Sequence, residues 1–130
     1  MINRLYVHNF RCLENFELPL AGRRSVLLVG ANGVGKSTVR HALRLLQRIA
    51  RGTNRVGQLV SPGECTRGRM DAPMRFELEV RLGEHLYRYL LALELLPRLR
   101  ELRVLQEAFY VDGEPVFTRE RAQVTLHLDE

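Results

Sequence analysis

The stretch Gly30-Ala31-Asn32-Gly33-Val34-Gly35-Lys36-Ser37 decides the fold, because its spacing is that of a phosphate-binding loop, G-x-x-x-x-G-K-[ST]. An apolar run at 26–29 precedes it, and a helix-forming stretch from Thr38 to Arg51 follows it. Strand, loop and helix in this order are the context that such a loop requires. The alternative interpretation is a glycine-rich turn that binds no ligand.

Each residue type in the loop has a chemical reason. Glycine lacks a Cβ and tolerates positive φ, so backbone N–H groups can turn toward a phosphate. The glycines that permit this are Gly30, Gly33 and Gly35. Lys36 would reach the β- and γ-phosphates, and the Ser37 hydroxyl would bind Mg²⁺. Thr38 offers a further hydroxyl and amide to the α-phosphate.

Composition indicates an ordinary globular chain of one domain or part of one. It has 130 residues, 20 of them basic and 15 acidic, with a formal net charge of +5. Lys36 is the only lysine, so every other basic residue is an arginine. The charge permits an anionic partner without requiring one.

Cysteine usage and hydropathy suggest the compartment. Cys12 and Cys65 are far apart and lack the spacing of a zinc site, which fits a reducing cytoplasm. We identify no signal peptide at the start of the sequence. The most apolar stretch, 86–96, contains Arg88 and Glu94 and is too short to cross a bilayer, so no membrane association is expected.

The segment 1–51 is predicted to hold the N-terminal strands, the loop and the first helix. Residues 2–10 favour a strand, Phe16 to Leu20 alternate as a half-buried edge strand, and 25–29 favour a strand covered on both faces. The apolar stripe expected to face the core comprises Val39, Ala42, Leu43, Leu46, Ile49 and Ala50. Another helix face carries Arg40, Arg44, Arg48 and Arg51. We interpret that face as solvated; the alternative is an acidic or nucleic-acid partner.

Beyond the helix, the pattern changes. Residues 52–73 are rich in Gly, Pro, Ser, Thr and Arg and are predicted to form a long loop. In 74–130, alternation predicts a hairpin from Phe76 to Leu95, a third strand at 102–111 and a tight turn at Asp112-Gly113. A last strand is expected around 124–128.

The opening of the chain resembles RecF- and SMC-like ATPases of the ABC class, including the OLD ATPases. The resemblance rests on a short strand ending in Asn9-Phe10-Arg11, a second strand, and the loop with its Asn32-Gly33 pair. It covers mainly residues 2–46, and 76–128 look like the antiparallel β-subdomain of the same heads. The implied fold class is α/β, a P-loop NTPase N-terminal lobe of the ABC-ATPase type, with one main helix.

The resemblance implies a head that binds ATP and Mg²⁺, and two heads that close around two nucleotides. The residues it implies for the nucleotide are Gly30, Asn32, Gly33, Val34, Gly35, Lys36, Ser37, Thr38 and Arg11, with Lys36 also catalytic and Ser37 contacting the metal. Gln58 and Gly63-Glu64 are the candidates for the family's loop glutamine position. The implied partners are a C-terminal lobe, a second head, and DNA or a nuclease in repair or anti-phage defence.

Important parts of such an ATPase are missing from the sequence. There is no Leu-Ser-Gly-Gly-Gln-type signature. The end of the chain, with Asp129 and Glu130, only superficially resembles a Walker B strand, and an exposed antiparallel strand fits its alternation better. Hydrolysis is therefore expected only with the C-terminal lobe. The alternatives are a small P-loop kinase and a non-catalytic, nucleotide-sensing module that docks a nuclease or nucleic acid. A GTPase motif Asn-Lys-x-Asp would need a second lysine.

Overall fold

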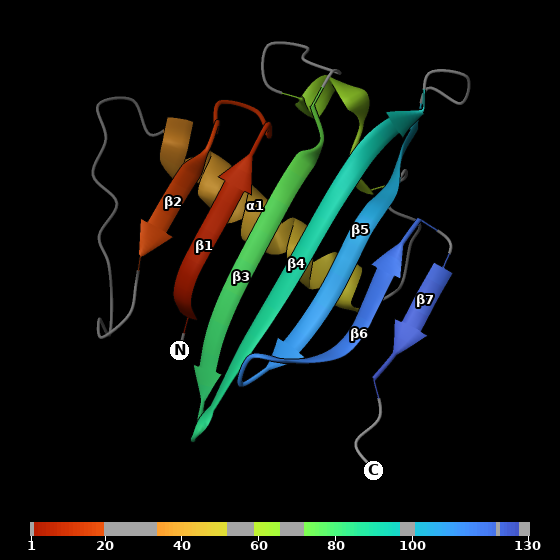
Figure 1. The fold of residues 1–130 in the computed structure, drawn as a ribbon. Helices are drawn as coiled ribbons and strands as arrows, with labels where there is room; N and C mark the ends of the chain where they lie inside the picture. Colours follow the sequence, from red (N-terminus) through yellow and green to blue (C-terminus); the bar gives the residue numbers. More distant parts are fainter. Residues whose placement is uncertain are drawn as a thin grey trace.

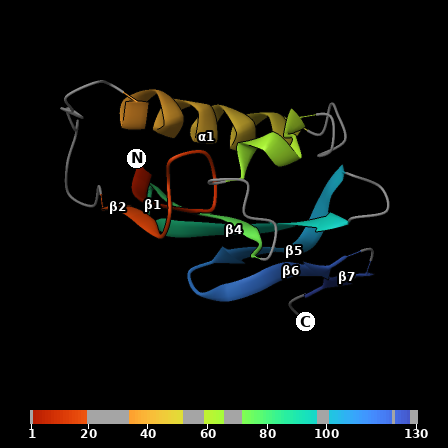
Figure 2. The same ribbon diagram turned by 90° about the horizontal axis from the view of Figure 1, so that it is seen from above.

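The computed structural model describes residues 2–19, 34–51, 59–65, 72–96, 101–121 and 123–127. These residues form one sheet and one long helix, which lie in two layers (Figures 1 and 2). The elements are β1 (Ile2–His8), β2 (Phe16–Pro19), α1 (Val34–Arg51), the 3-10 turn η1 (Pro62–Glu64), β3 (Met74–Leu82), β4 (His85–Leu96), β5 (Glu101–Val111), β6 (Glu114–Glu120) and β7 (Gln123–Leu126).

The described residues form a sheet of seven strands in the order β2-β1-β3-β4-β5-β6-β7, and every neighbouring pair is antiparallel. The described N-terminal strands therefore share one sheet with those of 74–130. β1 pairs with β3, and Leu5 lies opposite Leu78. β2 lies at one edge, as predicted from its proline, Pro19, and β7 lies at the other. The predicted β3–β4 hairpin and the β5 strand are confirmed.

The core lies between α1 and the sheet face that it covers. Alternation sends Leu5 and Val7 of β1, and Met74 and Phe76 of β3, toward the helix, while Arg75 points to the other face. Burying each such large apolar side chain is worth roughly 1.5–3 kcal/mol. The core cluster also contains Phe10, Leu13, Val39, Ala42, Leu45, Leu46, Val60, Cys65, Leu91, Leu93 and Leu102.

The helix begins earlier than predicted, and its buried face is rotated relative to the predicted apolar stripe. α1 starts at Val34, within the predicted loop. Ala50 is exposed, contrary to the prediction, while Leu45, which the stripe omits, is only 6% exposed. The reason is the segment 59–65, which buries Val60 in the core on the Leu45 side of the helix. Part of the predicted loop 52–73 is thus ordered structure that packs against the core.

Two short connections show how local sequence fixes the hairpins. Asp112 and Gly113 join β5 to β6, and both have positive φ, at 51° and 83°. A type I′ turn needs this at both central positions, which confirms the predicted tight turn. At the same end of the sheet, Gly83 begins the β3–β4 turn with φ at 62°.

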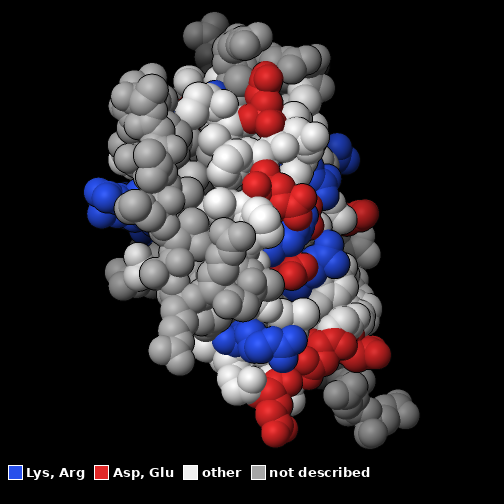
Figure 3. Space-filling view, turned by 90° about the vertical axis from the view of Figure 1, so that its left-hand side faces the viewer, with Lys and Arg blue, Asp and Glu red and all other residues white. Residues whose placement is uncertain are grey.

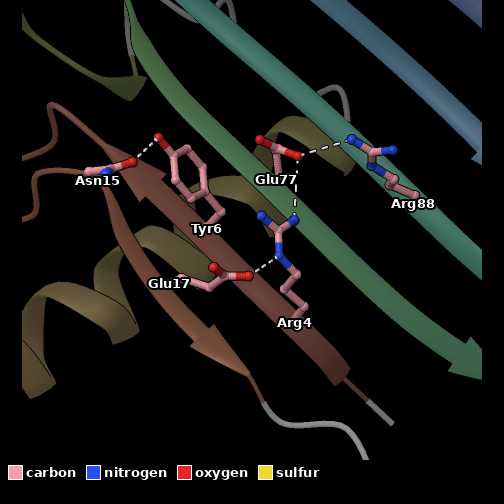
Figure 4. Close-up of polar contacts among 6 residues, drawn as sticks. All are labelled: Arg4, Tyr6, Asn15, Glu17, Glu77 and Arg88. Carbon is pink, nitrogen blue, oxygen red and sulfur yellow. Dashed lines mark hydrogen bonds and ion pairs between the residues drawn. The ribbon is translucent and has the colours of Figure 1, made fainter.

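The sheet face away from α1 carries a polar network (Figure 4). Arg4 Nε lies 2.5 Å from a Glu17 carboxylate oxygen, and its Nη1 lies 3.4 Å from Glu77. Arg88 also reaches Glu77, at 3.1 Å. These bonds, first the one to Glu17, raise the pKa of Arg4. The network connects four neighbouring strands, β2, β1, β3 and β4, across the face that the helix leaves uncovered.

Candidate nucleotide-binding site

The candidate site lies at the N-terminus of α1. Val34, Gly35, Lys36 and Ser37 form the first turn of this 18-residue helix, and that turn contains no acidic residue. The N–H groups of a first turn have no partner within the helix, and the helix dipole adds partial positive charge there. The backbone around Lys36 and Ser37 therefore suits an anion.

Several predicted residues lie outside the described part of the structure. They include the strand at 25–29, the loop residues Gly30, Asn32 and Gly33, and Gln58. Asp129 and Glu130 lie outside it as well. The strand before them, β7, is exposed and antiparallel to β6, as expected for an edge strand and unlike a buried Walker B strand.

Thr38 connects the first turn of α1 to the N-terminal strand. Its side chain is 3% exposed, and its hydroxyl lies 3.5 Å from the Cys12 thiol. Cys12 belongs to the turn between β1 and β2, in which Asn9 and Arg11 have positive φ at 59° and 53°. The turn that carries Arg11 is therefore fixed beside the start of α1. Thr38's hydroxyl faces the protein, and its expected contact with the α-phosphate stays a prediction.

Arg11 forms an ion pair that the sequence does not reveal. Its Nε and Nη2 lie 2.6 and 3.2 Å from the two carboxylate oxygens of Glu64. The backbone N–H of Arg11 also donates to the Glu64 carbonyl at 2.5 Å, and the guanidinium lies over the Phe10 ring. Glu64, a candidate for the loop glutamine position, thus holds Arg11. No local pattern pairs positions so far apart; only the fold brings them together.

Within the described part of the chain, two hollows flank α1. The smaller, about 200 Å³, lies between the helix, the turn at 9–13 and η1, and Arg11 and Glu64 line it. The larger, about 790 Å³, is a mostly apolar groove between α1 and strands β3 to β6. In the groove, the Tyr89 hydroxyl donates to the Glu107 carboxylate, and burial, followed by this bond, strongly raises the pKa of Tyr89.

Neither a metal cluster nor a membrane-spanning helix occurs among the described residues. No three His, Cys, Asp or Glu side chains in this part of the chain are placed to hold a metal ion. The same residues include no helix long and apolar enough to span a bilayer. For the predicted Mg²⁺, the contact expected from Ser37 therefore stays a prediction.

Comparisons with known proteins identify the family of the chain. Residues 1–72 match the sequence model of the AAA ATPase domain family. A segment of 46 residues is 48% identical to the OLD nuclease of Thermus scotoductus, over 35% of this chain and 8% of that protein. The match thus spans a small fraction of the relative's length. The resemblance to the N-terminal part of OLD- and RecF-like ATPases is confirmed, and the domain match implies a nucleotide-binding P-loop NTPase. This chain belongs to the AAA ATPase domain family.

Proposed function

We propose that this chain is the ATP- and Mg²⁺-binding lobe of a RecF/OLD-like ATPase, with an ABC-type N-terminal lobe and its antiparallel β-subdomain. The observation that carries the proposal is the first turn of α1, where Lys36 and Ser37 directly follow a glycine-rich loop in a chain of this family. A helix N-terminus with no acidic side chain in its first turn favours a phosphate group.

In this proposal, the loop and the first turn bind the phosphates of ATP. Lys36 supplies a compact positive charge to the β- and γ-phosphates, and Ser37 supplies a hydroxyl for Mg²⁺. Mg²⁺, when bound, neutralises phosphate charge and orients the oxygens. The residues proposed to contact the nucleotide are Gly30, Asn32, Gly33, Val34, Gly35, Thr38 and Arg11 in addition to these two.

We further propose that hydrolysis requires a C-terminal lobe, on the same chain or a separate one, and the pairing of two heads. Phosphoryl transfer depends on groups that position water and stabilise charge. The open groove beside α1 supports a further lobe, because Leu43, Leu78 and Phe109 expose apolar surface in it. Surfaces of this kind commonly bind another protein surface.

The cellular setting is also a proposal. Both cysteines are unpaired thiols, which supports a reducing cytoplasm. The similarity to a protein named as a nuclease supports a role beside a nuclease. DNA repair or anti-phage defence is the process that we propose for it.

Calorimetry with Mg²⁺-ATP tests the proposal. We expect the wild-type chain to bind and Lys36→Ala to bind at least about tenfold more weakly, because one charge-assisted phosphate contact is lost. Arg40→Ala is the matched control, since it removes one positive charge from the same helix, one turn further along. Ser37→Ala should weaken binding in Mg²⁺ and have little effect in EDTA.

Phosphate release in the same samples separates the alternatives. ATP binding that requires Lys36, without phosphate release, supports an ATP site that needs a C-terminal lobe for hydrolysis. Turnover by this chain alone would contradict the need for a further lobe. Phosphate transfer to another small molecule would favour a kinase, and equal binding by Lys36→Ala and wild type would overturn the site itself.

A further inference from the structure

The net charge of the protein is concentrated on α1. This helix contains Lys36 and four arginines and no acidic residue. The chain as a whole has 20 basic and 15 acidic residues, so the remainder outside α1 is balanced, with fifteen of each sign. α1 thus carries a charge equal to the whole formal net charge of +5. This places a positive electrostatic field on one side of the protein, which arginines scattered over the surface would not create.

Several arginines of the sheet region are paired with carboxylates. Arg4 and Arg88 are paired with Glu17 and Glu77 (Figure 4), and Arg121 Nε lies 3.0 Å from Glu94. Figure 3 shows basic and acidic side chains interleaved on the side of the molecule that carries the β2 edge. Among the described residues in this view, the two signs of charge alternate.

The arginine row of α1, which we define as Arg40, Arg44 and Arg48, differs from the sheet. All three side chains are exposed and recur at every fourth residue, so they lie on one helix face with about 6 Å between successive residues. Among the residues that the structure describes, none of the three forms an ion pair with a carboxylate. Like charges at this spacing oppose the helix slightly, so α1 bears a small cost that a polyanionic ligand would relieve.

The smaller hollow beside α1 adds a shaped site to this row. Arg44 and Arg48 line it, with His41 on the same helix and Arg11 and Glu64 opposite. Glu64 is already paired with Arg11, so the hollow presents two guanidinium groups without an acidic partner among its described lining residues. Its volume of about 200 Å³ equals that of about six or seven water molecules, enough for a phosphate group.

We propose that the arginine row binds the phosphate backbone of a polynucleotide, with Arg44 and Arg48 holding one phosphate in the hollow. The planar guanidinium fork matches phosphate oxygens in bidentate geometry. The row continues to Arg40, which suits a ligand with repeated charges more than one small anion. The row begins one turn beyond Lys36, and the hollow shares only Arg11 with the proposed ATP site, so the inference goes beyond that site and does not depend on it.

The test is fluorescence anisotropy of a labelled oligothymidylate with the full chain over a range of salt concentrations. We expect Arg44→Gln/Arg48→Gln to weaken binding about tenfold or more at low salt and to reduce the slope of log affinity against log salt by about 1.4. Arg88→Gln/Arg121→Gln is the matched control, because it removes the same charge from arginines that are paired on the sheet. The control should change binding less than about twofold if the row supplies the phosphate contacts.

Conservative variants and competitors make the outcomes decisive. Arg44→Lys/Arg48→Lys should keep the salt slope but lose several-fold affinity, because lysine lacks the fork. Lys36→Ala should lose ATP binding and keep oligonucleotide binding, which separates this proposal from the ATP site. The proposal would be overturned if Arg44→Gln/Arg48→Gln and Arg88→Gln/Arg121→Gln lost equal oligonucleotide affinity. It would also be overturned if the wild-type chain did not bind the oligonucleotide at low salt. Polyglutamate binding as tight as that of the oligonucleotide would replace it with an acidic polypeptide.

Discussion

Arg11 and Glu64 are joined at both backbone and side chain, although 53 positions separate them in the sequence. Their side chains are 35% and 30% exposed, so solvent screens the ion pair. We expect a double-mutant cycle with Arg11→Ala and Glu64→Gln to give a coupling energy of about 0.5–1 kcal/mol in urea unfolding. Perfectly additive effects would show that the two side chains do not stabilise the fold together.

The centre of the core can be tested at Phe76. This side chain is fully buried on β3 and meets the Phe10 ring edge-on, with centroids 5.4 Å apart. Phe76→Ala should lower the free energy of unfolding by about 3–5 kcal/mol, because it removes the contacts and leaves a cavity. Val124→Ala, on the exposed edge strand β7, should change it by less than about 0.5 kcal/mol. Similar losses for both variants would contradict the placement of the core.

Asp112 predicts an acid-dependent contribution to stability. Its carboxylate lies 2.7 Å from His85 Nδ1 and accepts the Leu86 N–H at 2.8 Å. The bond with His85, and then the one with Leu86, lowers the pKa of Asp112. Since the folded pKa is below the unfolded one, the stabilisation is present above about pH 4 and is lost as the pH falls through the folded pKa.

The corresponding variant is Asp112→Asn. Asparagine tolerates the positive φ of this turn, so the variant removes the charge and keeps the turn. Wild type should be the more stable protein at pH 7, and the difference should shrink at about pH 3. Urea unfolding across this pH range measures the effect. A constant difference at every pH would contradict the role of the carboxylate.

The two cysteines should react at very different rates. Cys12 is exposed, whereas Cys65 is 6% exposed, and burial raises the pKa of the Cys65 thiol. A brief maleimide pulse should therefore modify Cys12 in the native protein and Cys65 only after unfolding, as mass spectrometry of the peptides would show. Because Cys12 contacts Thr38, Mg²⁺-ATP should slow its labelling. Rapid native labelling of Cys65 would argue against its place in the core.

Local patterns in the sequence predict much of the sheet. The alternation in β3 and β4 and the Asp112-Gly113 turn act between near neighbours, so they can be read without the fold. The insertion of β1 between β2 and β3 cannot, because it depends on pairing across long distances in the sequence. The same limit explains Leu45, which is covered by a segment that resembles a loop by composition, and Glu64, which lies in that segment and pairs with the distant Arg11. The phosphate loop was predicted from residue chemistry, whereas the contrast between the charges of α1 and the sheet needed the structure.

The strand order has a consequence for how the protein folds. From β3 to β7 each strand pairs with the next, whereas β1 joins β3 through partners such as Arg4 and Glu77, 73 positions apart. Closing so long a loop costs more chain entropy, and such contacts form late. The N-terminal strand is thus synthesised first and should be completed last. During refolding, pulsed hydrogen exchange should protect β4 and β5 before β1, and the reverse order would contradict this sequence of events.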